Sequence, residues 1–165
     1  MEINAERVIE LVKSVRPLFM DHERASRITV KGAADFVTQV DFLVQERMRS
    51  GLFDMYPQVQ FMGEEKDNRD IDFSGAVWIL DPVDGTTNLI HDFRCSALSL
   101  ALCDRGQMEL GIIYQPYEDE LFLAQRGKGA FLNGNPIHVS SVKDLGQSLI
   151  SIGTSPHNHD LADRN

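Results

Sequence analysis

The sequence predicts an α+β fold in which two N-terminal helices precede an antiparallel meander of strands. Over the first third of the chain, apolar residues recur at the spacing of helices; from about residue 59 they follow the alternating or continuous pattern of strands. From residue 95 on, turns at 104–106 and 116–119 lead directly from one strand segment into the next. This order favours a segregated antiparallel sheet over a repeated βαβ arrangement.

The two expected helices are amphipathic. Over residues 4–20, apolar side chains recur every three or four positions with charged residues between them. Residues 31–35 are small and polar, which predicts a loop. A second helix is expected over 39–55, because its apolar residues share one side and Pro57 cannot continue it.

Strand patterns occupy most of the remaining chain. The run 76–80 is continuously apolar, is typical of a strand buried on both faces, and is expected to stop at Asp81-Pro82. Turn residues at 104–106, 116–119 and 133–136 separate later segments. The predicted strands cover residues 59–61, 76–80, 95–103, 107–115, 120–125 and 149–152.

Composition limits the classes of function. A chain of 165 residues is long enough for a single domain, and its net charge of -9 disfavours direct binding of nucleic acid or of anionic membranes. No apolar run is long enough to cross a membrane, and the acidic N-terminus lacks a secretory pattern, so a cytoplasmic location is expected. Cys95 and Cys103 are expected to be buried, reduced thiols that do not pair.

Two carboxylates follow the apolar run 76–80. Asp81 and Asp84 flank Pro82-Val83, and Gly85 then permits a sharp bend before Thr86-Thr87-Asn88, residues that often begin a helix. Carboxylate oxygens suit Mg²⁺, and the free N–H groups of a helix start suit phosphate oxygens. An ordinary turn also has this sequence, and the spacing of the two aspartates alone favours the turn. Glu64-Glu65 after another strand end adds acidic residues within reach.

These segments together resemble the inositol monophosphatase family. The resemblance rests on Gly63-Glu64-Glu65, on the run from Trp78 to Asn88, on Asp35 to Asp41 and on Arg126 to Gly134, and it covers nearly the whole chain. It implies that residues 1–165 are a single N-terminal metal- and phosphate-binding domain of a layered αβ sandwich of the sugar-phosphatase type. The later αβ layer of that fold is expected to be absent from this chain.

The resemblance also implies a role for each site residue. Two or three Mg²⁺ ions would be held by Glu64, Asp81, the carbonyl of Val83 and Asp84. Glu64 and Thr86 would position the attacking water, and Asp41 would orient the Thr86 hydroxyl. Gly85, Thr86 and Thr87 would bind the phosphate with Val83, Asp84 and Glu64 close by, while Lys31 and Asp35 would lie on a loop that helps to close the site.

The implied activity is Mg²⁺-dependent hydrolysis of a phosphate monoester of inositol or a similar sugar, in a lithium-sensitive homodimer. The alternatives within the superfamily are a 3′(2′),5′-bisphosphate nucleotidase and a histidinol-phosphate phosphatase. An alternative of another class is a protein-binding module without activity. His91 is expected to be structural, and the spacing of His157 and His159 in the polar tail is a weak metal-binding signal.

Overall fold

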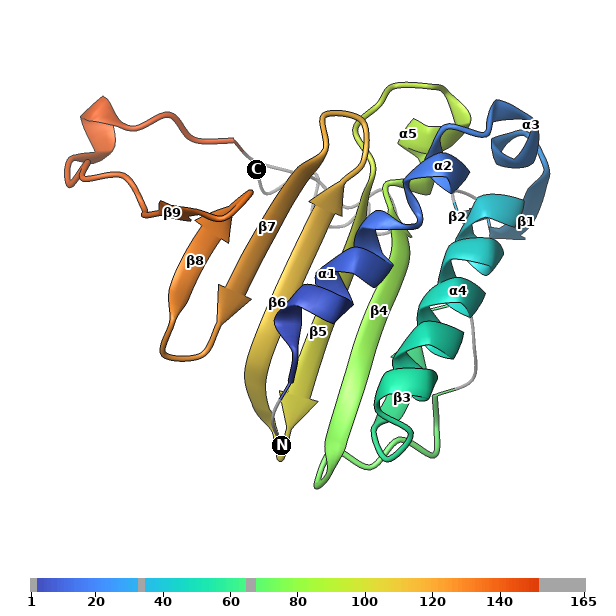
Figure 1. Cartoon of the computed structure of the whole chain (residues 1–165). Coiled ribbons are helices and arrows are strands. Elements are labelled where there is room, and N and C mark those ends of the chain that lie inside the picture. The colour runs from blue at the N-terminus through green and yellow to red at the C-terminus, as the bar shows by residue number, and fades with distance from the viewer. Residues whose placement is uncertain (1–2, 33–34, 65–67, 152–165) are drawn as a thin grey trace.

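The computed structural model of the protein describes residues 3–32, 35–64 and 68–151. Its centre is a seven-stranded sheet in which each strand lies beside the next one in the sequence (Figure 1). β3 pairs in parallel with β4, and each later neighbouring pair is antiparallel. The predicted α+β meander is therefore confirmed. The strands are β3 (Gln60–Gly63), β4 (Ala76–Asp84), β5 (Ala97–Asp104), β6 (Gln107–Gln115), β7 (Glu120–Gln125), β8 (Gly129–Leu132) and β9 (Asn135–Ile137).

The α-helices precede this sheet, apart from one short helix after β4, and a 3-10 helix, η1 (Leu145–Gln147), follows the last strand. The helix predicted over 39–55 is present as α4 (Gln39–Met55). The single helix predicted over 4–20 is wrong, because the segment forms α1 (Ala5–Lys13) and α2 (Arg16–Phe19). Pro17 explains the break: it has no N–H for the carbonyl four residues earlier, and its ring clashes with that carbonyl. α3 (His22–Ala25) follows, and α5 (Thr86–Ile90) is described with the site.

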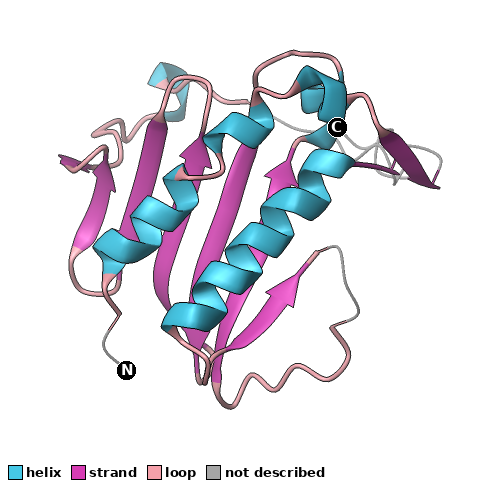
Figure 2. Ribbon diagram, turned by 45° about the vertical axis from the view of Figure 1, so that its right-hand side comes forward, coloured by secondary structure: helices cyan, strands magenta, loops and turns pink. Residues whose placement is uncertain are grey.

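One face of the sheet carries the helices and the core. Both Figure 1 and Figure 2 show α1 and α4 lying across the same face. Apolar side chains from this face and from the helices form one cluster, which includes Val12, Met48, Trp78, Leu100 and Ile112. Buried residues alternate along β5 and β6, as expected for strands with one face on the core. None of the helices in the described ranges is both long and apolar enough to cross a membrane.

The opposite face of the sheet bears small and apolar side chains at the alternate positions. Ile113 on this face is 49% exposed. A shallow cleft of 270 Å³ runs across β5 to β9. It is lined by Ser99, Leu100, Ala101, Gly111, Ile112, Ile113, Phe122, Leu123, Ala124, Ala130 and Ile137.

Several predicted boundaries differ from the structure. The loop predicted over 31–35 is part of a hairpin, in which β1 (Ile28–Gly32) pairs with β2 (Asp35–Thr38); residues 33–34 lie outside the described ranges. The last predicted strand, 149–152, is wrong for residues 149–151, which have no regular structure, while residue 152 is not described. A strand requires a hydrogen-bonding partner, and the fully exposed Leu149 indicates that this segment has not packed on the sheet.

The two cysteines also differ from each other. Both are free, as predicted, and Cys103 is buried in β5. Cys95 is exposed, so its predicted burial is wrong. It precedes β5, in the loop that leaves α5, rather than lying within the strand.

α1 is tied to the turn between β6 and β7 by a polar cluster. Tyr114 donates its hydroxyl proton to Asp119 Oδ1 over 2.8 Å, and Lys13 Nζ lies 3.2 Å from the same carboxylate. The hydrogen bond from Tyr114, followed by the contact with Lys13, holds the pKa of Asp119 below its ordinary value of 3.8. The ionised carboxylate therefore stabilises the folded state at neutral pH.

We expect Asp119→Asn to lower the free energy of unfolding by about 1 kcal/mol at pH 7, the usual contribution of such a hydrogen bond. Because a lowered pKa contributes stability that is lost as pH falls through the folded value, the difference between wild type and variant should shrink as the pH falls below 3.8, the ordinary value of this pKa. Urea unfolding at several pH values measures the difference. A difference that does not change with pH would mean that the carboxylate charge has no part in it.

Candidate active site

The first part of the candidate site is the end of β4, where the predicted carboxylates lie. The sequence predicted that this strand stops at Asp81, but β4 continues to Asp84. Its pairing with β5 shifts between Asp81 and Asp84, because Pro82 has no N–H to donate to the ladder. The irregularity keeps both aspartates on the strand, with Asp81 half-buried and Asp84 exposed.

The neighbouring strand brings Glu64 to Asp81. Gly63 ends β3 beside Leu80 of β4, and the Glu64 N–H donates to the Leu80 carbonyl over 3.1 Å. A Cβ added at Gly63 would lie 2.2 Å from Gln45 Oε1 on α4, so a larger residue there would require the Gln45 side chain to move. The pairing of β3 with β4 therefore sets the position of the Glu64 backbone.

The pKa of the Asp81 carboxyl is raised by its burial and by the acidic residues near it. Burial raises its pKa to about 7, helped by the charge of Glu64, a hydrogen bond with Glu64 and the charge of Asp84. Asp81 Oδ1 also accepts a hydrogen bond from the Val83 N–H over 3.1 Å. Like charges gathered in this way are stabilised by a bound cation, and carboxylate and carbonyl oxygens are the ligands that Mg²⁺ prefers. The chemistry of these oxygen donors therefore suits a divalent cation.

The predicted metal ligands differ in how they interact with Asp81. Glu64 and Asp81 are in hydrogen-bonding contact, whereas Asp84 acts on Asp81 through its charge. Among the residues that the structure describes, no group of three or more acidic, histidine or cysteine side chains is gathered tightly enough to hold a metal ion. Glu65, the other acidic residue of this loop, lies outside the described ranges.

A hydroxyl and a buried carboxylate form the second part of the site. Thr86, the first residue of α5, places its Oγ1 3.0 Å from Asp41 Oδ1 and 3.0 Å from the Val83 carbonyl oxygen. Asp41 lies in the first turn of α4 and is 2% exposed. The structure thus brings together Thr86, Asp41 and Val83, which are 45 residues apart at the extremes.

The turn between β4 and α5 is held by Gly85 and by two side chains that sequence reasoning missed. Gly85 has a φ of 87°, in the left-handed region, and is the N-cap residue that precedes α5. Ser96 Oγ donates to its carbonyl over 2.8 Å, and Asn88 Nδ2 donates to the Cys95 carbonyl over 2.7 Å. The roles of Ser96 and Asn88 depend on β5 lying beside this turn in the folded protein. No local sequence pattern predicts that contact. Thr87 is exposed on α5.

We expect Gly85→Ala to lower stability by about 1–2 kcal/mol from left-handed strain and to distort the site as well. The added Cβ would lie 3.0 Å from the Cys95 carbonyl oxygen. Gly106→Ala is the matched control, because Gly106 has a φ of 74° and open space around its Cβ position. Urea unfolding, and the phosphate release that the family resemblance implies, should separate the two: both variants should lose stability, and only Gly85→Ala should lose release. Equal release from both would show that the Cys95 contact is harmless.

The remaining predicted residues are placed as follows. Lys31 and Asp35 lie in the β1–β2 hairpin, and their side chains lie outside what the structure describes. His91 is exposed and ends α5. His157 and His159 are outside the described ranges.

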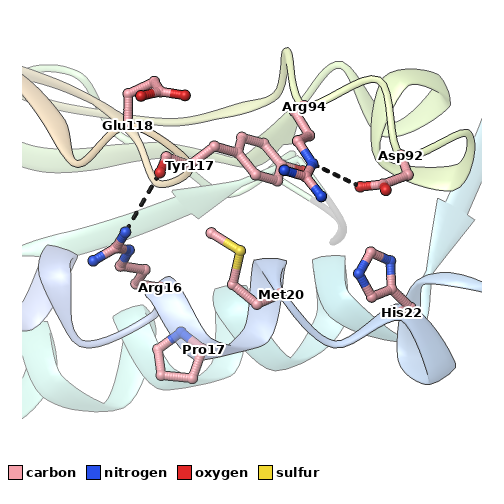
Figure 3. Close-up of a pocket in the computed structure, with 8 residues that line it drawn as sticks. All are labelled: Arg16, Pro17, Met20, His22, Asp92, Arg94, Tyr117 and Glu118. Atoms are coloured by element: carbon pink, nitrogen blue, oxygen red, sulfur yellow. Dashed lines mark hydrogen bonds and ion pairs between the residues drawn. The ribbon is translucent and has the colours of Figure 1, made fainter.

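A separate cavity of 350 Å³ lies between α2 and the turn after β6 (Figure 3). None of the residues described as lining it is among the predicted site residues. Its two arginines already have partners: Arg94 pairs with Asp92 at 3.4 Å, and Arg16 donates to the carbonyls of Pro116 and Tyr117. Arg94 is therefore paired with an acid, whereas the described partners of Arg16 are backbone carbonyls.

Comparison with known proteins defines first a class and then a family. The relatives of this chain with named activities are phosphoric monoester hydrolases, and their fold has N-terminal helices on a mostly antiparallel sheet. The inositol monophosphatase family matches residues 1–165, the full length of the sequence, and the chain belongs to this family.

Three relatives illustrate the match. Inositol monophosphatase of Dictyostelium discoideum is 39% identical over 150 residues, which are 88% of this chain and 55% of the relative. The structure of extragenic suppressor protein suhB from Bartonella henselae has a TM-score of 0.76 at 32% identity, covering 84% of this chain and 55% of the other. An IMPase/NADP phosphatase complexed with NADP and Ca²⁺ has a TM-score of 0.69 at 28% identity, covering 81% and 49%. The chain therefore spans about half the length of these relatives.

Proposed function

We propose that this chain forms the metal- and phosphate-binding part of a Mg²⁺-dependent phosphatase that acts on a phosphate monoester of inositol or a similar sugar. The observation that carries the proposal is the meeting of two pairs at one strand end: Glu64 with Asp81, and Thr86 with Asp41. The first pair supplies hard oxygen ligands. The second supplies the Thr86 hydroxyl, whose orientation is set by its hydrogen bond to Asp41. Family membership and the names of the relatives support the same activity.

The chain's own residues would share the chemistry as follows. Glu64, Asp81, the Val83 carbonyl and Asp84 would hold two or three Mg²⁺ ions, and the Ca²⁺ in a solved relative supports a divalent cation. Bound Mg²⁺ would lower the pKa of a water and neutralise charge on the phosphate. Thr86 donates its hydroxyl proton to Asp41, so its oxygen is left to accept a hydrogen bond from the attacking water. Glu64 would accept a hydrogen bond from the other O–H of that water and so help to position it.

The start of α5 would bind the phosphate. The first N–H groups of a helix have no acceptor within the helix, so those of Gly85, Thr86 and Thr87 can donate to phosphate oxygens. The left-handed conformation of Gly85 turns this peptide segment directly after Asp84. Phosphate oxygens and the acidic residues would thus meet across the cation.

The test is release of phosphate from inositol 1-phosphate by the whole 165-residue chain, with Mg²⁺ and with a chelator. Asp84→Asn should abolish release, and Asp54→Asn, a change at an exposed carboxylate on α4, should not. Release that survives Asp84→Asn would contradict the proposed site. A folded chain that releases no phosphate would contradict the activity and favour a protein-binding role.

A second candidate substrate is favoured by one relative, the phosphatase solved with NADP. The same assay with NADP, 3′-phosphoadenosine 5′-phosphate and histidinol phosphate tests the nucleotidase and histidinol-phosphate alternatives. Faster release from a nucleotide than from inositol 1-phosphate would reassign the substrate and leave the site unchanged. The homodimer and the inhibition by Li⁺ belong to the same proposal and are checked by sedimentation and by adding Li⁺ to the assay.

A further inference from the structure

Thr38 occupies the junction between two elements next to the candidate site. It is the last residue of β2 and the residue that caps α4, and it is 1% exposed. β2 contacts both α4 and α5, so this junction lies beside the start of the helix that carries Thr86 (Figure 1). A buried polar residue here must find hydrogen-bond partners within the protein.

Both donors of Thr38 go to one oxygen of Asp41. The Thr38 N–H donates to Asp41 Oδ2 over 2.8 Å, and the Thr38 hydroxyl donates to the same oxygen over 2.6 Å. The Thr38 hydroxyl oxygen in turn accepts from the Val40 N–H over 3.1 Å. This is a capping box, in which the cap residue and the third helical residue satisfy each other.

The two carboxylate oxygens of Asp41 therefore accept hydrogen bonds from different residues. Oδ2 is held from the Thr38 side, and Oδ1 is left to accept from the Thr86 hydroxyl at 3.0 Å. A carboxylate held at one oxygen by two donors has a fixed side-chain rotamer. Fixing Asp41 in turn fixes the acceptor to which Thr86 donates.

We infer that Thr38 is a positioning residue, whose hydroxyl orients the Asp41 carboxylate so that Asp41 holds the Thr86 hydroxyl. This inference rests on the proposed function, in which Thr86 positions the attacking water. The order of influence is Thr38, then Asp41, then Thr86, and Thr38 itself touches neither water nor substrate. The hydrogen bonds that begin α4 therefore also set the geometry of the site.

The competing explanation is that Thr38 only caps α4. A cap contributes to stability, and its loss would weaken the helix without changing the conformation of Thr86. The two explanations differ in what happens at Thr86 when the Thr38 hydroxyl is removed and the fold is kept. The test therefore needs a direct measurement on the Thr86 side chain.

The experiment compares Thr38→Val, which keeps the shape and loses the hydroxyl, with Thr38→Ser, which keeps the hydroxyl. Three-bond NMR couplings of the Thr86 side chain report its rotamer in the folded, metal-free chain. We expect a single rotamer in wild type and Thr38→Ser, and averaging in Thr38→Val. In the phosphatase assay, kcat of Thr38→Val should fall about 5- to 30-fold with KM nearly unchanged, and Thr38→Ser should restore it.

Asn4→Ala is the control for helix capping. Asn4 caps α1 through a 3.1 Å hydrogen bond from the Arg7 N–H, and none of its described hydrogen bonds involves the site. It should lower stability without changing the Thr86 couplings. Unchanged couplings in Thr38→Val would overturn the inference even if that variant is less stable. If wild type releases no phosphate, the proposed function fails and the couplings still decide the role of Thr38.

Discussion

Replacing Asp81 with asparagine should reduce phosphate release at least about 100-fold and make the metal-free protein more stable. Asparagine keeps the shape of the side chain and its hydrogen bond with the Val83 N–H. It removes the negative charge that burial and the nearby Glu64 and Asp84 oppose. Activity and stability therefore change in opposite directions at this position.

The stability gain should depend on pH in a defined direction. Asp81 has its pKa raised from 3.8 to about 7 in the folded protein, so its ionised form opposes folding at neutral pH. The advantage of Asp81→Asn should be absent below about pH 4, grow with pH and level off above about pH 7. At pH 7 we expect on the order of 1 kcal/mol, since the side chain is partly screened by solvent.

Thermal unfolding with and without Mg²⁺ completes this test. A cation that binds the folded state raises the unfolding temperature, and wild type should gain more from it than Asp81→Asn. Asp54→Asn again serves as the control, and its response to Mg²⁺ should match that of wild type. An equal response of all three proteins would mean that Asp81 does not contribute to cation binding.

Replacing Trp78 with alanine should produce the largest loss of stability, about 3–5 kcal/mol. Trp78 is 1% exposed near the start of β4, and its ring centroid lies 5.9 Å from that of Tyr56. The substitution would leave a cavity between the sheet and α4. Because the buried indole Nε1 has no partner in the described structure, Trp78→Phe should cost much less.

Urea unfolding of the two Trp78 variants provides the comparison. The midpoint for Trp78→Ala should fall far below that of wild type with a similar slope, and Trp78→Phe should lie close to wild type. Equal losses in the two variants would show that Nε1 makes a hydrogen bond that matters for stability. Both variants should keep the order of the strands, since the backbone pairing of β4 does not depend on this side chain.

The elements that sequence predicted well are those with a complete local pattern. α4, β6 and β7 have the predicted bounds, because periodic apolar residues run up to clear turn residues on each side. The first helix was predicted too long because its apolar spacing continues through Pro17, and the missing N–H outweighs that spacing. The β1–β2 hairpin was missed because small residues in its turn region are typical of a loop.

The site was predictable where the motif is local and not where it depends on tertiary contacts. Asp81, Asp84, Gly85 and Thr86 lie within six positions, so their meeting at the end of β4 follows from the chain itself. Thr38 was not singled out from the sequence, since its link to the site exists only once α5 packs beside β2. Local patterns report neither that packing nor which cap residues have a second partner.

The meander has a consequence for how the chain folds. Because strands β4 to β9 each pair with the next one in sequence, the sheet can form one hairpin at a time with short loops to close, and such contacts form quickly. Helix α1 is different, since its Lys13 meets Asp119, 106 residues further on. Closing a loop of that length carries a larger entropic cost, so docking of α1 should come after the hairpins. We therefore expect the N-terminal helix to pack last, on a sheet whose strands have already paired.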